Sequence, residues 1–459
     1  MKRSPKQPHD RQAVSRRRFL VAGSGLVAGG SLALTGNRVL AEDQNEIEPA
    51  RPPLHLRTLG RTGWQATDIS LGCIRISDAN VVRYAYDAGI NYFDTAEVYG
   101  NGQSETLIGE AMQHMDRKKI FITSKLRISD EDTDLTIRDR FNQCLSRLQT
   151  DYIDCLCMHS VKEIAWKDHP AFHAAMNALK ADGKLRFIGI TSHGPDSDEQ
   201  DSMEQVLCAA AEDGRWDLML LVYGFLNQEA GENVLAACKA KNVGTSAMKY
   251  APGRLEVPLW DPENPSPDFQ ASIERIMGRG ETRETAIQRI QDWVDEQTRN
   301  VADMQPFLEE HGIESVEQLR AKSIQWVLQN RDMHTVCVTM NSFEELDTYL
   351  ALSGTDLSQT DQGWLRDYGR LLERQYCRHA CQSCLGACPN GLPVSKIMRY
   401  AYYFSGQGRE KYAMQKYARL RGENGAACLT CSAPCTAACP HEVNVPAQMF
   451  AAHSLLSLV

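Results

Sequence analysis

Polar side chains that could move a proton follow three successive apolar strands in the first third of the chain. Asp94 ends a short strand and Tyr99 lies five residues later in a glycine-containing loop, while Lys125 and His159 end the next two strands. An ammonium group beside a phenol stabilises the phenolate and lowers the phenol pKa. A neutral imidazole can hydrogen-bond a substrate oxygen. The set predicts proton transfer to a carbonyl oxygen.

Each member of this set has a specific expected role. Tyr99 is the general acid or base, Lys125 tunes the pKa of Tyr99, Asp94 orients Lys125, and His159 positions the substrate oxygen. Taken alone, a lysine after a strand is usually a solvated charge and a histidine is often a satisfied core group. Their occurrence at three successive strand ends favours the catalytic interpretation.

The elements that must position these residues are short β-prone segments that alternate with helix-period segments from Leu54 to about Leu352. The predicted strands are Asp68–Cys73, Asn91–Thr95, Ile120–Ser124, Ile153–Met158, Phe187–Thr191, Asp217–Val222, Val243–Met248 and Thr335–Thr339. Eight such strands imply an α/β fold, a closed (β/α)8 TIM barrel over residues 54–356. The segment Leu56–Thr67 is predicted to be a hairpin that plugs the lower end of the barrel.

A long insertion, residues 252–321, separates the seventh strand from its helix. It begins with a proline-rich loop, Pro258–Pro265, and continues with a polar helix predicted at Ala286–Glu309. Long insertions at the catalytic rim of a barrel commonly form a lid or a partner surface. Packing over the outside of the barrel is the alternative interpretation.

The segment from Leu56 to about Leu352 resembles the aldo/keto reductase family. The resemblance is carried by Leu59-Gly60-Arg61-Thr62-Gly63, Gly89–Ala96, Tyr99-Gly100, Ser104-Glu105, Lys125, Asp151–Asp154 and His159. The catalytic Asp, Tyr, Lys and His of that family fall on Asp94, Tyr99, Lys125 and His159. The resemblance implies an oxidoreductase that interconverts a carbonyl and an alcohol with NADP(H).

The nicotinamide contacts of the family are matched less well. The contacts that the resemblance implies are Ser192-His193 for the carboxamide, Tyr223 for stacking on the ring, and Ser342 for the 2′-phosphate. Leu220 stands where the family usually has Gln, and Met340-Asn341 precedes Ser342 where a basic residue is usual. Without that cation the main charge-assisted phosphate contact is missing. The sequence therefore does not identify the hydride donor.

Eight of the fifteen cysteines lie in two spaced quartets near the C-terminus. The spacing is Cys377-x3-Cys381-x2-Cys384-x3-Cys388-Pro389 and Cys428-x2-Cys431-x3-Cys435-x3-Cys439-Pro440. This pattern resembles that of bacterial two-cluster ferredoxins. It predicts a ferredoxin-like domain over residues 361–459 with two 4Fe-4S clusters. One is held by Cys377, Cys381, Cys384 and Cys439, and the other by Cys428, Cys431, Cys435 and Cys388.

Structural zinc and disulfide bonds are the alternatives for these cysteines. Helices are predicted at Asp361–Tyr376 and, between the quartets, at the tyrosine-rich segment Ile397–Leu420, whose tyrosines are expected to pack in a core. The remaining cysteines are expected to be buried apolar residues, namely Cys73, Cys144, Cys155, Cys157, Cys208, Cys238 and Cys337.

The N-terminus reads as a twin-arginine export signal, residues 1–41. Ser15–Leu20 contains three consecutive arginines, a glycine-rich apolar run extends to Leu34, and Val39–Ala41 resembles a cleavage site. The run is shorter than the roughly 20 residues that span a bilayer, and no later run is long enough. We therefore expect a periplasmic or cell-envelope protein without a transmembrane segment in its mature chain.

The composition limits the classes of partner that this protein can bind. The net charge of -9 and the absence of a basic cluster in the mature sequence argue against a nucleic-acid partner. We expect a small carbonyl or alcohol substrate, with the clusters relaying electrons from a redox protein or quinone-linked partner. The competing interpretation is an electron-transfer or binding module in which the barrel is a scaffold and the clusters are functional or structural.

Overall fold

The computed structural model describes residues 52–195, 199–251, 260–265, 269–270, 273–274, 277, 282–313, 316–372, 376–379, 381–405, 410–420 and 424–457. The predicted export signal lies outside these residues. So do residues 258–259 of the predicted proline-rich loop. Within the described residues, no helix is both long enough and apolar enough to cross a membrane.

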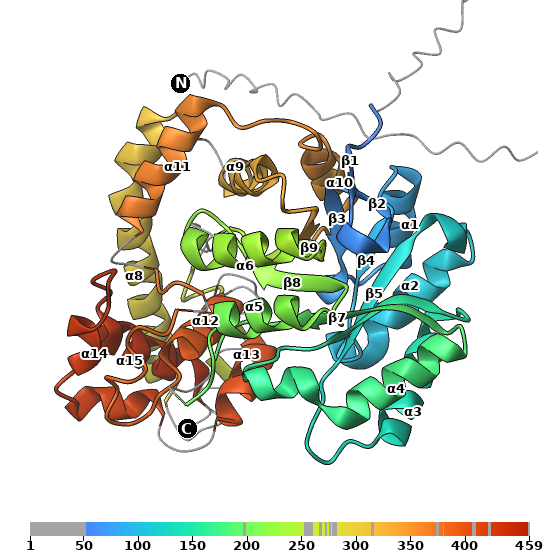
Figure 1. The fold of residues 1–459 in the computed structure, drawn as a ribbon. Coiled ribbons are helices and arrows are strands. Elements are labelled where there is room, and N and C mark those ends of the chain that lie inside the picture. The colour runs from blue at the N-terminus through green and yellow to red at the C-terminus, as the bar shows by residue number, and fades with distance from the viewer. Residues whose placement is uncertain are drawn as a thin grey trace, which may run out of the picture. The chain divides into compact units, whose positions relative to one another are not determined.

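Eight parallel strands form a closed barrel, which confirms the predicted barrel (Figure 1). The strands are β3 (Ile69–Gly72), β4 (Tyr92–Asp94), β5 (Phe121–Leu126), β6 (Ile153–Met158), β7 (Leu185–Thr191), β8 (Leu218–Val222), β9 (Gly244–Met248) and β10 (Thr335–Val338). Pairing of β10 with β3 closes the sheet. Because both faces of a barrel strand are covered, β5 and β6 are buried at every residue.

Helices cover the outside of the strands. They are α1 (Ala79–Asp87), α2 (Gln103–Met112), α3 (Asp134–Leu148), α4 (Pro170–Ala181), α5 (Met203–Asp213), α6 (Gln228–Ala240), α9 (Val316–Gln329) and α10 (Phe343–Leu350). Thr133 and Ser202 form capping boxes that begin α3 and α5. The apolar faces of the helices bury one large core against the sheet.

The predicted hairpin is present and plugs the lower end of the barrel. Strands β1 (Leu56–Thr58) and β2 (Gln65–Thr67) are antiparallel, and Leu59 packs with residues at the beginnings of the barrel strands. Gly60 has a φ of 49°, and a Cβ there would lie 2.3 Å from the backbone nitrogen of Gly244. Only glycine fits this approach, so the plug is tightly registered.

The described part of the insertion packs on its own core and on the end of the barrel domain. Helix α8 (Arg283–Glu310) matches the predicted polar helix. Its Met304 and Phe307 share a core with Leu319 of α9 and Trp364 of α11 (Gln359–Leu371). Within the described ranges, Arg320 of the predicted insertion lines the cavity at the barrel mouth, whereas none of the residues described between 260 and 313 does. Packing over the outside is therefore favoured for residues 260–313 only.

The C-terminal segment is a small helical unit. It contains α12 (Val394–Ser405), α13 (Glu410–Ala418), α14 (Pro434–Ala437) and α15 (Val445–Leu456), which share one apolar core. The prediction of one helix over Ile397–Leu420 is wrong, because α12 ends at Ser405 and α13 begins at Glu410. The sequence between them contains Gly406 and Gly408, and glycine disfavours a helix interior.

Candidate active site

The structure brings the four predicted catalytic residues to the mouth of the barrel. Asp94 ends β4 and Lys125 lies in the adjacent strand β5. Lys125 Nζ donates to Asp94 Oδ1 at 2.5 Å and to the Thr95 carbonyl at 2.7 Å, and it lies 4.9 Å from the centre of the Tyr99 ring. The ring centres of Tyr99 and His159 are 6.0 Å apart. A proton donor and a hydrogen-bonding imidazole therefore lie together.

The charges at this site are set by burial and by the pairing of Lys125 with Asp94. Burial by itself lowers the pKa of Lys125, but Asp94, with smaller contributions from Tyr99 and Cys337, raises it above its usual value. Burial raises the pKa of Tyr99, and the Lys125 ammonium opposes this only in part. Tyr99 is therefore a protonated phenol at neutral pH. The sequence had predicted a lowered pKa.

His159 is a neutral imidazole. Burial lowers its pKa well below the usual value, and the nearby cations Lys125, Arg127, Lys249 and Lys416 lower it further. Its Nδ1 is buried and has no hydrogen-bond partner in the structure. A neutral ring with an unused nitrogen suits hydrogen bonding to a substrate oxygen.

Buried polar groups fix the strand ends behind the site. Glu105 of α2 is fully buried and accepts hydrogen bonds from Ser124 Oγ at 2.5 Å and from Arg147 Nε at 2.6 Å. Ser104 Oγ lies 2.8 Å from Thr95 Oγ1 and donates to the Cys73 carbonyl. These contacts hold the residues next to Asp94 and Lys125, so the pair has little freedom to move.

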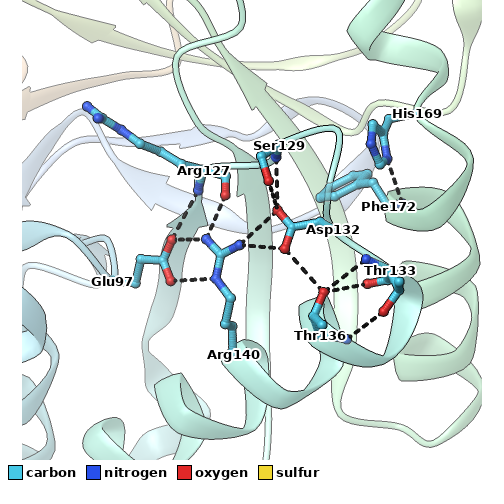
Figure 2. A network of polar contacts seen from close by, with 9 residues as sticks. All are labelled: Glu97, Arg127, Ser129, Asp132, Thr133, Thr136, Arg140, His169 and Phe172. Carbon is cyan, nitrogen blue, oxygen red and sulfur yellow. Dashed lines mark hydrogen bonds and ion pairs between the residues drawn. The ribbon is translucent and has the colours of Figure 1, made fainter.

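A second network holds the loops above the site (Figure 2). Arg140 of α3 forms ion pairs with Glu97 and Asp132, and also donates to the Arg127 carbonyl. Glu97 Oε1 accepts from the Arg127 backbone at 3.1 Å. The network thus ties the loop that carries Tyr99 to the loop after β5.

A cavity of 1190 Å³ lies over these residues. Asp94, Tyr99 and His159 line it from the barrel, and Lys396, Arg399 and Tyr403 of α12 are among the lining residues from the C-terminal segment. The active-site cavity is therefore built from both parts of the chain. The sequence did not predict this shared cavity.

Two further histidines extend the line of rings from the site towards the first cysteine quartet. The ring centres of His159 and His193 are 6.3 Å apart, and those of His193 and His379 are 5.9 Å apart. His193 Nδ1 and His379 Nε2 are buried without a hydrogen-bond partner. His379 lies two residues after Cys377.

A second tyrosine–lysine pair lies in the same cavity. Lys249, which follows β9 with a φ of 54°, donates through Nζ to Tyr403 Oη at 2.8 Å. Burial alone raises the pKa of Tyr403, but Lys249 and Arg399 together lower it to about 7. A left-handed backbone at a non-glycine residue is strained and occurs often at functional sites. Because its pKa is about 7, the Tyr403 hydroxyl is expected to ionise near neutral pH.

Of the predicted nicotinamide contacts, only His193 lines the cavity. Tyr223 is buried with its ring 5.1 Å from that of Trp326 and its hydroxyl accepting from Asn330. Ser192 is fully buried and accepts from Gly194, and Ser342 caps α10. These three side chains are engaged in the barrel wall and α10, so they offer no open face to a ring in the cavity.

Cysteines of the two quartets lie within electrostatic range of one another, and Cys384 is within such range of Cys435 of the other predicted set as well as of Cys381 and Cys439. Cys377 lies within electrostatic range of Cys381, Cys384 and Cys439. Cys428 lies within such range of Cys388, Cys431 and Cys435. None of the fifteen cysteines, all of which lie in the described ranges, forms a disulfide bond. No group of three or more His, Cys, Asp or Glu side chains in the described part of the chain is arranged to hold a single metal ion.

Sequence reasoning missed several residues of the cavity. Cys337 was expected to be an apolar core residue, but it is only partly buried and lines the cavity, where it faces Asp94. Lys249, Arg399 and Tyr403 were not singled out. The spacing of Arg399 and Tyr403, four residues apart on one helix face, was the available signal.

The fold and these residues define a (β/α)8-barrel enzyme with an Asp-Tyr-Lys-His site at the carboxyl ends of its strands. The sequence profile of the aldo/keto reductase family matches residues 64–366, and the chain belongs to that family. The family membership identifies it as an oxidoreductase-type enzyme.

Individual relatives cover parts of the chain. L-galactose dehydrogenase of Arabidopsis thaliana is 30% identical over 238 residues, which are 46% of this chain and 71% of that protein. A probable aldo-keto reductase of Glycine max is 28% identical over 34% of this chain and 47% of its own length. The NADH-specific methylglyoxal reductase of Escherichia coli is 22% identical over 63% of this chain and 86% of that protein.

Among solved structures, the holo form of an aldo-keto reductase from Bacillus halodurans is 19% identical. It covers 68% of this chain and 96% of its own, with a TM-score of 0.47.

Proposed function

We propose that this protein interconverts a carbonyl and an alcohol at the barrel mouth, with Tyr99 as the general acid or base. The observation that supports this most strongly is Lys125, whose ammonium group contacts Asp94 and the Tyr99 ring at once. In the reducing direction, the carbonyl carbon must gain the equivalent of a hydride, two electrons and one proton, from the donor, and the protonated Tyr99 phenol donates its proton to the substrate oxygen. His159 hydrogen-bonds the same oxygen, and Lys125 stabilises the phenolate that is left.

We further propose that the two cysteine sets each hold a 4Fe-4S cluster, as the proximity of their thiols supports. Such clusters, when bound, exchange single electrons with a partner. Twin-arginine export suits a protein that loads its cofactor before leaving the cytoplasm. It also places the enzyme where no replenished nicotinamide pool is expected, so the clusters are the proposed electron relay to a redox protein or quinone-linked partner.

The alternative donor is NADP(H), which the family membership favours. Three of the residues expected to contact NADP(H) do not fit this role. Tyr223, Ser192 and Ser342 make hydrogen bonds to Asn330, Gly194 and Glu345 instead. The same observation favours a second candidate function, an electron-transfer or binding module in which the barrel is a scaffold. Two measurements on the anaerobically purified protein distinguish these functions. Titration with NADP(H) tests for nucleotide binding, and ultraviolet-visible and EPR spectra test for the clusters.

Turnover of Tyr99→Phe tests the proposal. We expect the wild type to reduce methylglyoxal or oxidise L-galactose, the compounds in the names of two relatives, with reduced viologen, NADH or NADPH as donor, or with an oxidised acceptor. Loss of the general acid lowers turnover by about 100- to 10,000-fold. Tyr86→Phe is the matched control, since Tyr86 lies on α1, is not among the residues that line the cavity, and its hydroxyl accepts from the Asp116 backbone nitrogen. Equal activity of wild type and Tyr99→Phe would refute the role of Tyr99.

A further inference from the structure

The cavity carries a large excess of positive charge. Nine lysine and arginine side chains line it, whereas Asp94 and Glu163 are the carboxylates among the described lining residues. Asp94 is already paired with Lys125. A concave site lined by one sign of charge focuses its field and concentrates ligands of the opposite sign. The cavity is therefore suited to an anion.

Four of these cations form a group that we name the cationic cradle: Arg127, Lys162, Lys396 and Lys416. The first two follow β5 and β6 of the barrel, while Lys396 lies on α12 and Lys416 on α13. The Lys162 and Lys396 side chains adjoin each other, and Arg127 lies within electrostatic range of both. Lys416 is close to Arg127 and Lys396. Both parts of the chain thus contribute.

The fold holds this cradle in place rather than leaving it as mobile surface charge. The Arg127 backbone is fixed by Glu97 and Arg140, while its side chain extends away from that network (Figure 2). Lys162 and Lys396 are largely buried beside each other, and Glu163 acts on Lys162 as a neighbouring carboxylate.

Two independent observations agree with an anion in this position. Burial and the neighbouring cations lower the pKa of Lys162 to about 7, and burial with Arg127 lowers those of Lys396 and Lys416 to about 8. A bound anion would reverse these shifts. In addition, the buried nitrogens His193 Nδ1 and His379 Nε2 lack partners at the same cavity. Buried polar atoms without partners commonly mark a ligand position.

We propose that the cationic cradle binds a phosphate or carboxylate group of the substrate whose carbonyl or alcohol reacts at Tyr99. The assignment of the carbonyl or alcohol group to Tyr99 rests on the proposed function. The anion-binding site does not depend on that function. Arg127 and Lys416 are among the cations that act on His159, so the cradle adjoins the reaction end. Lysine and arginine are the side chains that bind such anions best.

Binding of charged and uncharged sugars to the full-length, anaerobically purified protein tests this proposal. Glucose 6-phosphate, glucuronate and glucose serve as the phosphate, carboxylate and uncharged probes in calorimetric titrations. The test variant is Lys162→Gln/Lys396→Gln. The matched control is Lys118→Gln/Lys119→Gln, which removes the same charge from two exposed lysines. Circular dichroism and melting temperature check that both variants fold.

We expect at least one charged probe to bind more tightly than glucose, and the test variant to weaken that binding about tenfold or more while the control does not. Equal binding of charged and uncharged probes, or equal loss in both variants, overturns the proposal. A third outcome also overturns it. If neither charged sugar binds, but NADP(H) does and is weakened by the test variant, the cradle serves the nucleotide phosphates.

The same titration separates this inference from the proposed function. Tyr99→Phe should bind the charged sugar as the wild type does, because the cradle is intact. If Tyr99→Phe also turns over normally, the proposed function fails and the anion site stands. If Tyr99→Phe loses turnover while Lys162→Gln/Lys396→Gln binds the charged sugar like the wild type, the anion site fails and the proposed function stands.

Discussion

Two tyrosine–lysine pairs face the same cavity, but they differ in their remaining partners. Lys125 contacts Tyr99 and is also bound to Asp94 at 2.5 Å, so most of its charge is compensated by the carboxylate. Lys249 donates directly to Tyr403, and Arg399 adds a second cation. The pKa of Tyr99 is raised, whereas that of Tyr403 is lowered to about 7.

The difference shows that a lysine beside a phenol does not by itself produce a phenolate. What decides the protonation state is the net charge of the whole buried group. The first pair, with its carboxylate, keeps a proton available for donation. The second pair, with two cations, stabilises the anion. Only the first is assigned to proton transfer.

Lys125→Met breaks the first pair and should have the largest effect. It leaves Asp94 buried without its ion-pair partner and removes the charge that stabilises the Tyr99 phenolate. We expect turnover to fall about 100- to 10,000-fold, as for other losses in acid–base catalysis. The measurement is kcat for methylglyoxal reduction, with Lys118→Met as the control. Retained kcat would mean that the pair is structural only.

Lys249→Met breaks the second pair. Without Lys249, only Arg399 still opposes the effect of burial, so the pKa of Tyr403 should rise from its value of about 7. An ultraviolet difference titration at the tyrosinate band should show one phenol ionising near pH 7 in the wild type and none there in the variant. Tyr403→Phe should abolish the same step. A step that persists in Tyr403→Phe would assign it to another tyrosine.

The pH dependence of anion binding sharpens the comparison of charges. A bound anion favours protonated lysines, whose pKa values in the free protein are about 7 for Lys162 and about 8 for Lys396 and Lys416. Binding should therefore be strongest below pH 7 and weaken severalfold as pH rises from 6.5 to 8.5. The groups that face these lysines are Arg127, Glu163, Arg419 and Tyr403. Glucose 6-phosphate titrations at several pH values measure the effect, and pH-independent binding would contradict it.

Arg140→Gln should have the smallest effect, because it acts on the loops and not on either pair. It leaves the partly buried carboxylates of Glu97 and Asp132 without their shared cation. Leaving such acceptors unpaired costs about 1 to 3 kcal/mol of unfolding free energy, reduced here by partial exposure. Chemical denaturation measures the loss. Arg138→Gln, at a more exposed ion pair on the same helix, is the control.

The barrel was predictable from the sequence because each strand is a short local pattern, and the first pair followed from the position of Asp94 and Lys125 at adjacent strand ends. The second pair could not be predicted in the same way. Lys249 and Tyr403 are 154 residues apart, and a tyrosine-rich helix is ordinarily a packing element. The charge state of Tyr99 was also missed, since burial is a property of the tertiary structure.

The most direct test compares kcat of Tyr99→Phe and Tyr403→Phe in one assay, with methylglyoxal and the donor that supports wild-type turnover. The assignment of proton transfer to the first pair predicts a loss of about 100-fold or more for Tyr99→Phe and a much smaller loss for Tyr403→Phe. A large loss in Tyr403→Phe with activity retained in Tyr99→Phe would contradict it and move the reaction to the second pair.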